Sequence, residues 1–245
     1  RRTRWDGVSR LYTAVRAVYN RVLRDRLPRK FGVYASVPAR HVRFLDRDDH
    51  RPDYKAGLIS AIHDVVGADD FVCLVGAGRG VSSVHACRAG AQQVYAYEAA
   101  REMVEIARET VDVSEVSERV HVSHALVGPA ISVYGDASHA PDVSPSDLVA
   151  GDVLVLDCEG AEASILASIE ADYEAVIVET HPERGVSTAR TRSRLDEMGY
   201  HIDERVYHPD CEHEDKCVLV GRFGDPLQRV RLHQNEESSW RSSRL

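Results

Sequence analysis

Short apolar runs rich in β-branched residues alternate with amphipathic segments along most of this chain of 245 residues. The run Phe71–Val75 and the run at 152–156 have the length and composition of strands that are buried on both faces. Segments between the runs, such as 101–111, have the apolar spacing of helices. This alternation predicts an α/β fold, a mostly parallel sheet with helices on both faces. Further strands are expected at 93–97, 120–123, 175–179, 201–207 and 217–222, the last two as an antiparallel hairpin, and further helices at 52–66, 80–89, 162–169 and 187–198.

The chain divides by charge into a basic N-terminal extension and an acidic body. Residues 1–51 contain 14 Lys and Arg against 5 Asp and Glu, although the whole chain has a net charge of −8. Apolar residues three to five apart predict an amphipathic helix over 5–27, packed on the body, on a second subunit of a homodimer, or on a membrane surface. A short hairpin of 33–36 with 41–45 is expected next. We therefore expect a helix and hairpin extension at 1–51, one domain at 52–223 and a polar tail at 224–245.

Composition indicates the cellular location and the partners expected for the domain. No apolar run approaches the roughly 20 residues of a membrane span, and no signal-peptide core is visible. The 5 cysteines are odd in number, and three lie in or beside expected buried elements. This pattern favours reduced thiols and a cytoplasmic location, with peripheral membrane contact through residues 1–27 left open. The acidic body argues against nucleic acid as a partner, since phosphate binding needs a basic face.

A glycine-rich loop follows the first buried strand and opens a helix. Gly76, Gly78 and Gly80 let the backbone turn tightly and approach a ligand without a Cβ in the way. The dinucleotide fingerprint needs a third glycine where this chain has Val81, so the spacing suits a ligand without a pyrophosphate. Glu98 ends the next strand, where a carboxylate can accept both hydroxyls of a ribose. Together these residues predict a site for an adenosine-containing cofactor.

Carboxylates gather where two later strands end. Asp157, Glu159 and Glu162 follow one strand, and Glu179 and His181 close the next. Ligands of open α/β sheets bind at this edge, so these side chains are placed for chemistry. Asp157 is a candidate base or orienting group, and His181 is a candidate general base or a structural histidine. Glu162 is favoured as a helix-start residue. Alternatively, a set of oxygen ligands with one imidazole would hold Mg²⁺ or Mn²⁺, formed by Asp157, Glu159, Glu179 and His181.

These motifs, in this order, resemble those of the FkbM-type methyltransferases over about residues 52–222. The family's loop reads roughly Asp-x-Gly-Ala-Asn-x-Gly, its second strand ends in Glu, and its fourth strand ends in Asp-Val-Glu-Gly-Ala-Glu. This chain has Asp-Cys-Glu-Gly-Ala-Glu at 157–162, and Leu74 where the family's loop begins with an acid. The resemblance implies a seven-stranded class I fold whose last strand is antiparallel, and S-adenosylmethionine as cofactor. It implies that the cofactor is bound by Gly76, Ala77, Gly78, Gly80, Glu98, His124, Ala125 and Asp157.

The resemblance also implies an activity, O-methylation of a hydroxyl or carboxyl group on a small molecule or glycan. Asp157, His181 and Glu159 are then the catalytic candidates, and Arg184 is the candidate to bind an acidic acceptor. The alternatives are an RNA methyltransferase, a non-catalytic adenosyl-binding protein and a nicotinamide oxidoreductase. The polar turn with His208, Cys211, His213 and Cys217 has residue types that zinc prefers, but its spacing matches no familiar finger.

Overall fold

The computed structural model describes residue 18 and residues 30–42, 48–129, 135–170, 172–207 and 216–223, with side chains described outside 203–207. The amphipathic helix expected at 5–27, the polar turn at 208–215 and the tail at 224–245 therefore lie outside the described residues, Val18 excepted. Among the residues described, no helix combines the length and apolar character needed to cross a lipid bilayer.

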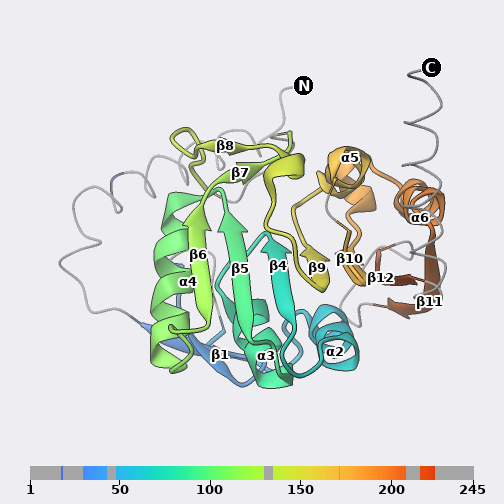
Figure 1. Cartoon of the computed structure of the whole chain (residues 1–245). Coiled ribbons are helices and arrows are strands. Elements are labelled where there is room, and N and C mark those ends of the chain that lie inside the picture. Colours follow the sequence, from blue (N-terminus) through green and yellow to red (C-terminus); the bar gives the residue numbers. More distant parts are fainter. Residues whose placement is uncertain are drawn as a thin grey trace, which may run out of the picture.

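A seven-stranded sheet forms the centre of the molecule (Figure 1). Neighbouring strands are paired in parallel except at β12, which runs antiparallel to both β10 and β11. The predicted parallel sheet with an antiparallel last strand is thus confirmed. The order across the sheet is β11 (Tyr200–Tyr207), β12 (Cys217–Phe223), β10 (Ala175–Glu179), β9 (Val153–Leu156), β4 (Phe71–Val75), β5 (Gln93–Glu98) and β6 (Val120–His124).

Helices cover both faces of this sheet and create two hydrophobic cores. Alternation along each strand separates the cores, since Leu74 packs in one cluster and Cys73 in the other. The first cluster is closed by the first three helices and the second by the last two. The helices of the described residues that pack on this sheet are, in chain order, α2 (Ala56–Val65), α3 (Val81–Ala89), α4 (Arg101–Val113), α5 (Glu162–Ser168) and α6 (Thr188–Glu197).

A small sheet of β1 (Phe31–Tyr34), β2 (Val37–Arg40) and β3 (His50–Arg51) packs beside α4. The predicted hairpin is present, but its second strand starts at Val37 and not at His41. Ala35 and Ser36 explain the shift, because both have positive φ (45° and 67°) and form a two-residue turn. Helix α2 likewise begins at Ala56 and not at Pro52, because Lys55 before it is left-handed at φ 51°.

The looser region after β6 has short elements of its own. Strands β7 (Leu126–Val127) and β8 (Asp142–Val143) pair in parallel, and a 3-10 turn, η2 (Pro145–Asp147), follows them. A second 3-10 turn, η3 (Pro182–Arg184), follows β10 directly. The turns η2 and η3 both lie beyond the carboxyl ends of parallel strands. The predicted site residues meet at this edge of the sheet.

Candidate functional site

The glycine-rich loop fits tightly against the end of β9 and leaves one position open. A Cβ at Gly76 (φ 91°) would lie 1.9 Å from the Asp157 carbonyl oxygen, so only glycine fits there. A Cβ at Gly78 (φ 53°) would meet no atom within 4 Å. The N–H groups of Gly76 and Ala77 donate to the Tyr97 carbonyl at 2.9 and 3.0 Å. The loop is thus tied to β5 and β9, and its backbone at Gly78 is accessible to a ligand.

Glu98 lies beneath this open position and is held rigidly. Its Oε2 accepts from the Gly78 N–H at 2.8 Å, and its Oε1 accepts from the Ala100 N–H at 2.9 Å. Burial raises the pKa of the Glu98 carboxyl, while the Ala100 and Gly78 N–H groups and the Lys55 charge oppose that rise. Each carboxylate oxygen keeps a further lone pair. The side chain is therefore oriented to accept hydrogen bonds from a ribose bound over the loop.

The other predicted cofactor residues have different positions around the loop. Gly80 serves packing, because a Cβ there would lie 2.9 Å from the Ala107 carbonyl of α4. The Ala125 N–H donates to the Glu98 carbonyl at 2.9 Å. His124 Nε2 lies 3.0 Å from the Ala99 carbonyl. These residues border the Glu98 end of the loop, whereas Asp157 borders its beginning.

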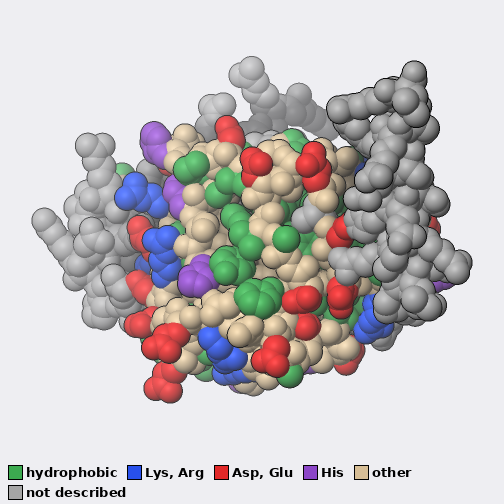
Figure 2. Space-filling model, viewed as in Figure 1, with side chains coloured by type: hydrophobic (Ala, Val, Ile, Leu, Met, Phe, Trp, Pro, Cys, Tyr) green, Lys and Arg blue, Asp and Glu red, His purple; other side chains and the backbone are tan. Residues whose placement is uncertain are grey.

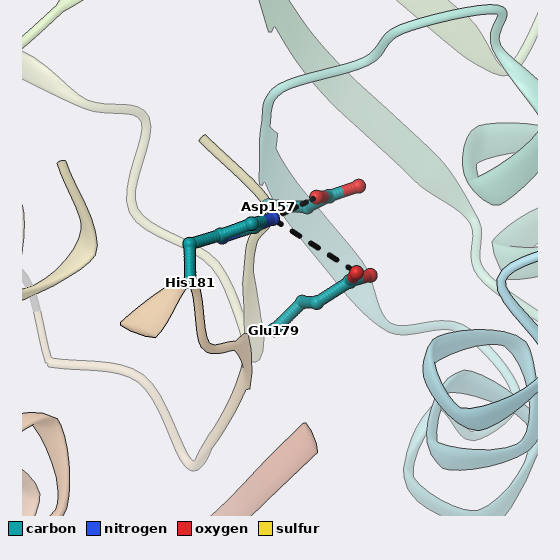
Figure 3. A group of neighbouring side chains, drawn as sticks. All are labelled: Asp157, Glu179 and His181. Atoms are coloured by element: carbon teal, nitrogen blue, oxygen red, sulfur yellow. Dashed lines mark ion pairs between the residues drawn. The ribbon is translucent and has the colours of Figure 1, made fainter. Parts of the chain in front are cut away.

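Asp157, Glu179 and His181 come together at the ends of β9 and β10 (Figure 3). His181 Nε2 lies 3.8 Å from Asp157 Oδ1 and 3.9 Å from Glu179 Oε1. One nitrogen and two carboxylate oxygens fall within 4.8 Å of one another, and all three residues are buried. This group contains three of the four metal ligands expected from the sequence, and Glu159 is not in it.

Glu162 orients the histidine of this group. Its Oε1 lies 2.7 Å from His181 Nδ1 and also accepts from the Gly160 N–H at 3.1 Å. Because a carboxylate only accepts, Nδ1 carries the proton and Nε2 is directed at Asp157 and Glu179. Glu162 is 1% exposed, so its role extends beyond beginning α5. Burial also raises the pKa of the neighbouring Cys158 thiol well above its usual range, and the charges of Glu162 and Glu159 raise it further.

Two lysines that the sequence analysis missed complete the charge balance. Lys55 Nζ forms an ion pair with Asp157 Oδ2, and Lys216 Nζ lies 3.2 Å from Glu179 Oε1. Burial of Lys216 lowers its pKa, but Glu179, Glu183 and Glu159 outweigh this, so the pKa is raised overall. A signal did exist, because the chain has 3 lysines among its 31 Lys and Arg, and two of the three lie here.

Arg184 and Glu159 form the outer part of the site. Arg184 Nη2 donates to Glu159 Oε2 at 3.1 Å, and both side chains are partly exposed. Glu159 has a left-handed backbone (φ 54°). Its side chain reaches Arg184 and is not part of the group around His181. The predicted substrate arginine is thus partly exposed and already has an anionic partner.

Strand order, glycine loop and the acid ending β5 together define the class I methyltransferase fold. The protein Trm5b from Pyrococcus abyssi has this fold with a TM-score of 0.52 and 12% identity, over 80% of this chain and 56% of that one. The M1A22 tRNA methyltransferase TrmK of B. subtilis gives a TM-score of 0.46 and 15% identity, over 68% of this chain and 65% of that one. At these identities the likeness describes the fold alone.

Sequence comparison gives a further similarity. The chain is 30% identical over 128 residues to a ribosomal protein L11 methyltransferase of Enterococcus faecalis. The match covers 49% of this chain and 38% of that protein's length. No family model matches the chain.

These comparisons correct one expectation drawn from the acidic composition. The FkbM-type motifs predicted a small-molecule or glycan acceptor, and the acidic body argued against nucleic acid as a partner. The sequence relative of this chain is a methyltransferase of a ribosomal protein, which is a macromolecular acceptor. The expectation that nucleic acid is an unlikely partner was therefore wrong. The charge of the acidic body was a poor guide, because the excess of Lys and Arg in this chain is concentrated at 1–51, outside that body.

Proposed function

We propose that this protein is an S-adenosylmethionine-dependent methyltransferase that methylates an amine on a basic protein. The class I fold, the open backbone at Gly78 and the fixed Glu98 carboxylate support the cofactor assignment. Bound S-adenosylmethionine supplies a methyl group on a positively charged sulfur. The FkbM-type motif at 157–162 belongs to this proposal as the segment where the cofactor and acceptor sides of the site meet.

The observation that carries the choice of acceptor is the carboxylate group around His181. Asp157, Glu162 and Glu179 are all buried at the ends of β9 and β10. Buried carboxylates favour a cationic group beside them and disfavour an anionic one. Asp and Glu side chains also lie along the upper edge of the face in Figure 2, over β7 and β8. A protonated amine fits this environment better than a carboxyl or phosphate acceptor.

His181 is the base in this proposal. The Glu162 hydrogen bond holds the Nδ1 proton, which leaves Nε2 to take a proton from the acceptor ammonium. The nitrogen lone pair freed by this transfer is then the nucleophile. Lys55 and Lys216 offset two of the three buried carboxylates, and the acceptor ammonium offsets the third, so the proposed step needs no divalent cation. Activity should therefore survive exhaustive dialysis against EDTA.

The similarity by sequence supports a protein acceptor, because that relative is a methyltransferase of ribosomal protein L11. RNA is the second candidate acceptor. RNA is favoured by the composition of residues 1–51, which contain 14 Lys and Arg against 5 Asp and Glu. A basic segment of this kind supplies the sequence-independent part of RNA binding.

Transfer of a radiolabelled methyl group tests both acceptors at once. Ribosomes and total RNA from a strain without the gene are incubated with the protein and methyl-labelled S-adenosylmethionine, then digested with ribonuclease or protease. We expect label that resists ribonuclease and appears as methylated amine on protein. Label lost with ribonuclease would select RNA, and label released by mild base would indicate a carboxyl ester. His181→Ala should lower kcat by about 10²–10⁴-fold while cofactor binding persists.

A further inference from the structure

Lys55 occupies an unusual place between the cofactor loop and the catalytic group. It is the residue before α2 and has a left-handed backbone (φ 51°, ψ 37°). Its ammonium reaches the end of β9, 102 residues away, and pairs with Asp157 Oδ2. The Asp157 side chain is 4% exposed and the Lys55 side chain 22%. The pair is thus mostly enclosed, and Lys55 is its more exposed member.

The Lys55–Asp157 pair adjoins the part of the loop that binds the cofactor. The Asp157 N–H donates to the Val75 carbonyl at 2.9 Å, and its own carbonyl lies against Gly76. The Lys55 charge also acts on Glu98, at the opposite side of the loop. The ammonium therefore lies within electrostatic reach of both carboxylates that flank the glycine-rich loop.

The glycine-rich loop has no acidic residue of its own. Leu74 takes the position two residues before Gly76, and its side chain is completely buried in the core. A cationic group of a ligand at the start of the loop must then find its anion elsewhere. Asp157, whose backbone carbonyl lies against Gly76, has a buried carboxylate directly after β9.

We propose that Lys55 and Asp157 form the subsite for the amino-acid end of S-adenosylmethionine, with Lys55 binding its carboxylate and Asp157 its ammonium. The inference rests on the proposed function and assigns residues to one part of its cofactor. In the free protein the two side chains neutralise each other. A zwitterion entering between them supplies each with a new partner of opposite charge, so no buried charge is left unpaired during the exchange. The existing ion pair keeps the subsite charged and ready in the absence of ligand.

Two ligands that differ only at the amino-acid end test this assignment. S-adenosylhomocysteine carries the zwitterion, whereas 5′-methylthioadenosine has the adenosine and thioether without it. Calorimetric titration of Lys55→Met should show a loss of about 10–100-fold in affinity for S-adenosylhomocysteine. Affinity for methylthioadenosine should change by less than about threefold, which also shows that the adenosine pocket is folded. Lys55→Arg should keep most of the discrimination between the two ligands.

The matched control is Lys30→Met, which removes the same charge from a pair with Asp49 in which both side chains are more than half exposed. It should leave both affinities unchanged. Equal losses for the two ligands in Lys55→Met, or no loss for either, would overturn the subsite. A wild-type protein that binds neither ligand would overturn the proposed function and the subsite with it. A wild-type protein that binds both ligands equally would overturn the subsite alone.

Discussion

At the scale of single residues, the site is built from buried charges in partnered positions. Asp157 pairs with Lys55, Glu179 with Lys216, and Glu162 with His181. Breaking such a pair leaves a charge in a low-dielectric environment, which is why a buried ion pair is sensitive to loss of one partner. These pairs hold His181 and the carboxylates in one arrangement without a bound ligand.

The contact between Gly76 and Asp157 gives a prediction at this scale. Both Gly76→Ala and Gly78→Ala put a Cβ on a residue with positive φ, which costs about 1–2 kcal/mol. Only Gly76→Ala also overlaps backbone, since its Cβ would lie 1.9 Å from the Asp157 carbonyl oxygen. We expect Gly76→Ala to lose more than about 3 kcal/mol of unfolding free energy by urea denaturation, and Gly78→Ala about 1–2 kcal/mol. Equal losses would show that the loop can move away from β9.

At the scale of elements, the β1–β2 hairpin is bound to α4 by an ion pair and to the glycine-rich loop by a hydrogen bond. Arg40 Nε lies 2.7 Å from Glu109 Oε2 on α4, and the Arg40 side chain is 9% exposed. Arg79, within the loop, donates to the Arg40 carbonyl at 3.0 Å and lies over the Tyr34 ring. The hairpin therefore supports the loop from outside the main sheet.

Removal of the Arg40 side chain is predicted to weaken the packing of the β1–β2 hairpin on α4. Interactions of this kind with charged groups contribute about 1.5–3 kcal/mol, so Arg40→Ala should lower the unfolding free energy by that amount. The hairpin amides should also exchange faster with deuterium. Arg88→Ala is the matched control, because Arg88 is exposed and reaches the hairpin only at 3.4 Å from the Ser36 carbonyl. It should cost less than about 0.5 kcal/mol. Similar costs for the two variants would contradict the role given to Arg40.

At the scale of the whole molecule, the sheet separates two cores, and the second core contains groups that resist ionisation. Burial raises the pKa of Cys73 to about 11 from its usual value of 9.0, and it also raises the pKa of Tyr173. Above pH 9 the unfolded chain releases the Cys73 proton while the folded chain keeps it. The contribution of Cys73 to the free energy of unfolding is thus fully present below pH 9 and is lost as the pH rises toward 11.

Alkaline denaturation measures this effect. Between pH 9 and 11 the Cys73 contribution should fall by about 1.4 kcal/mol per pH unit. Cys73→Val keeps the side chain apolar and similar in size, so its unfolding free energy should fall less steeply over this range. The slopes are compared and not the absolute values, because the valine also changes the packing. Parallel slopes for the two proteins would mean that Cys73 ionises equally in both states.

Local patterns were sufficient for much of the fold and for part of the site. The strand and helix periods of 71–198 predicted the sheet, because each buried strand or helix face repeats within a few residues. Gly76, Gly78 and Glu98 were identified because the ends of successive parallel strands meet at one edge. The same rule brought Asp157, Glu179 and His181 together.

Only the tertiary structure decided which partners complete these motifs. No local pattern links Lys55 to Asp157, because the sequence separation of 102 residues is bridged by the packing of α2 on the sheet. Glu162 had a sufficient local explanation as a helix-start residue, and its bond to His181 depends on how β9 and β10 align. Sequence alone thus determined the elements and the edge where they act. The charge pairs depend on long-range contacts, and these are set by the assembled sheet and helices.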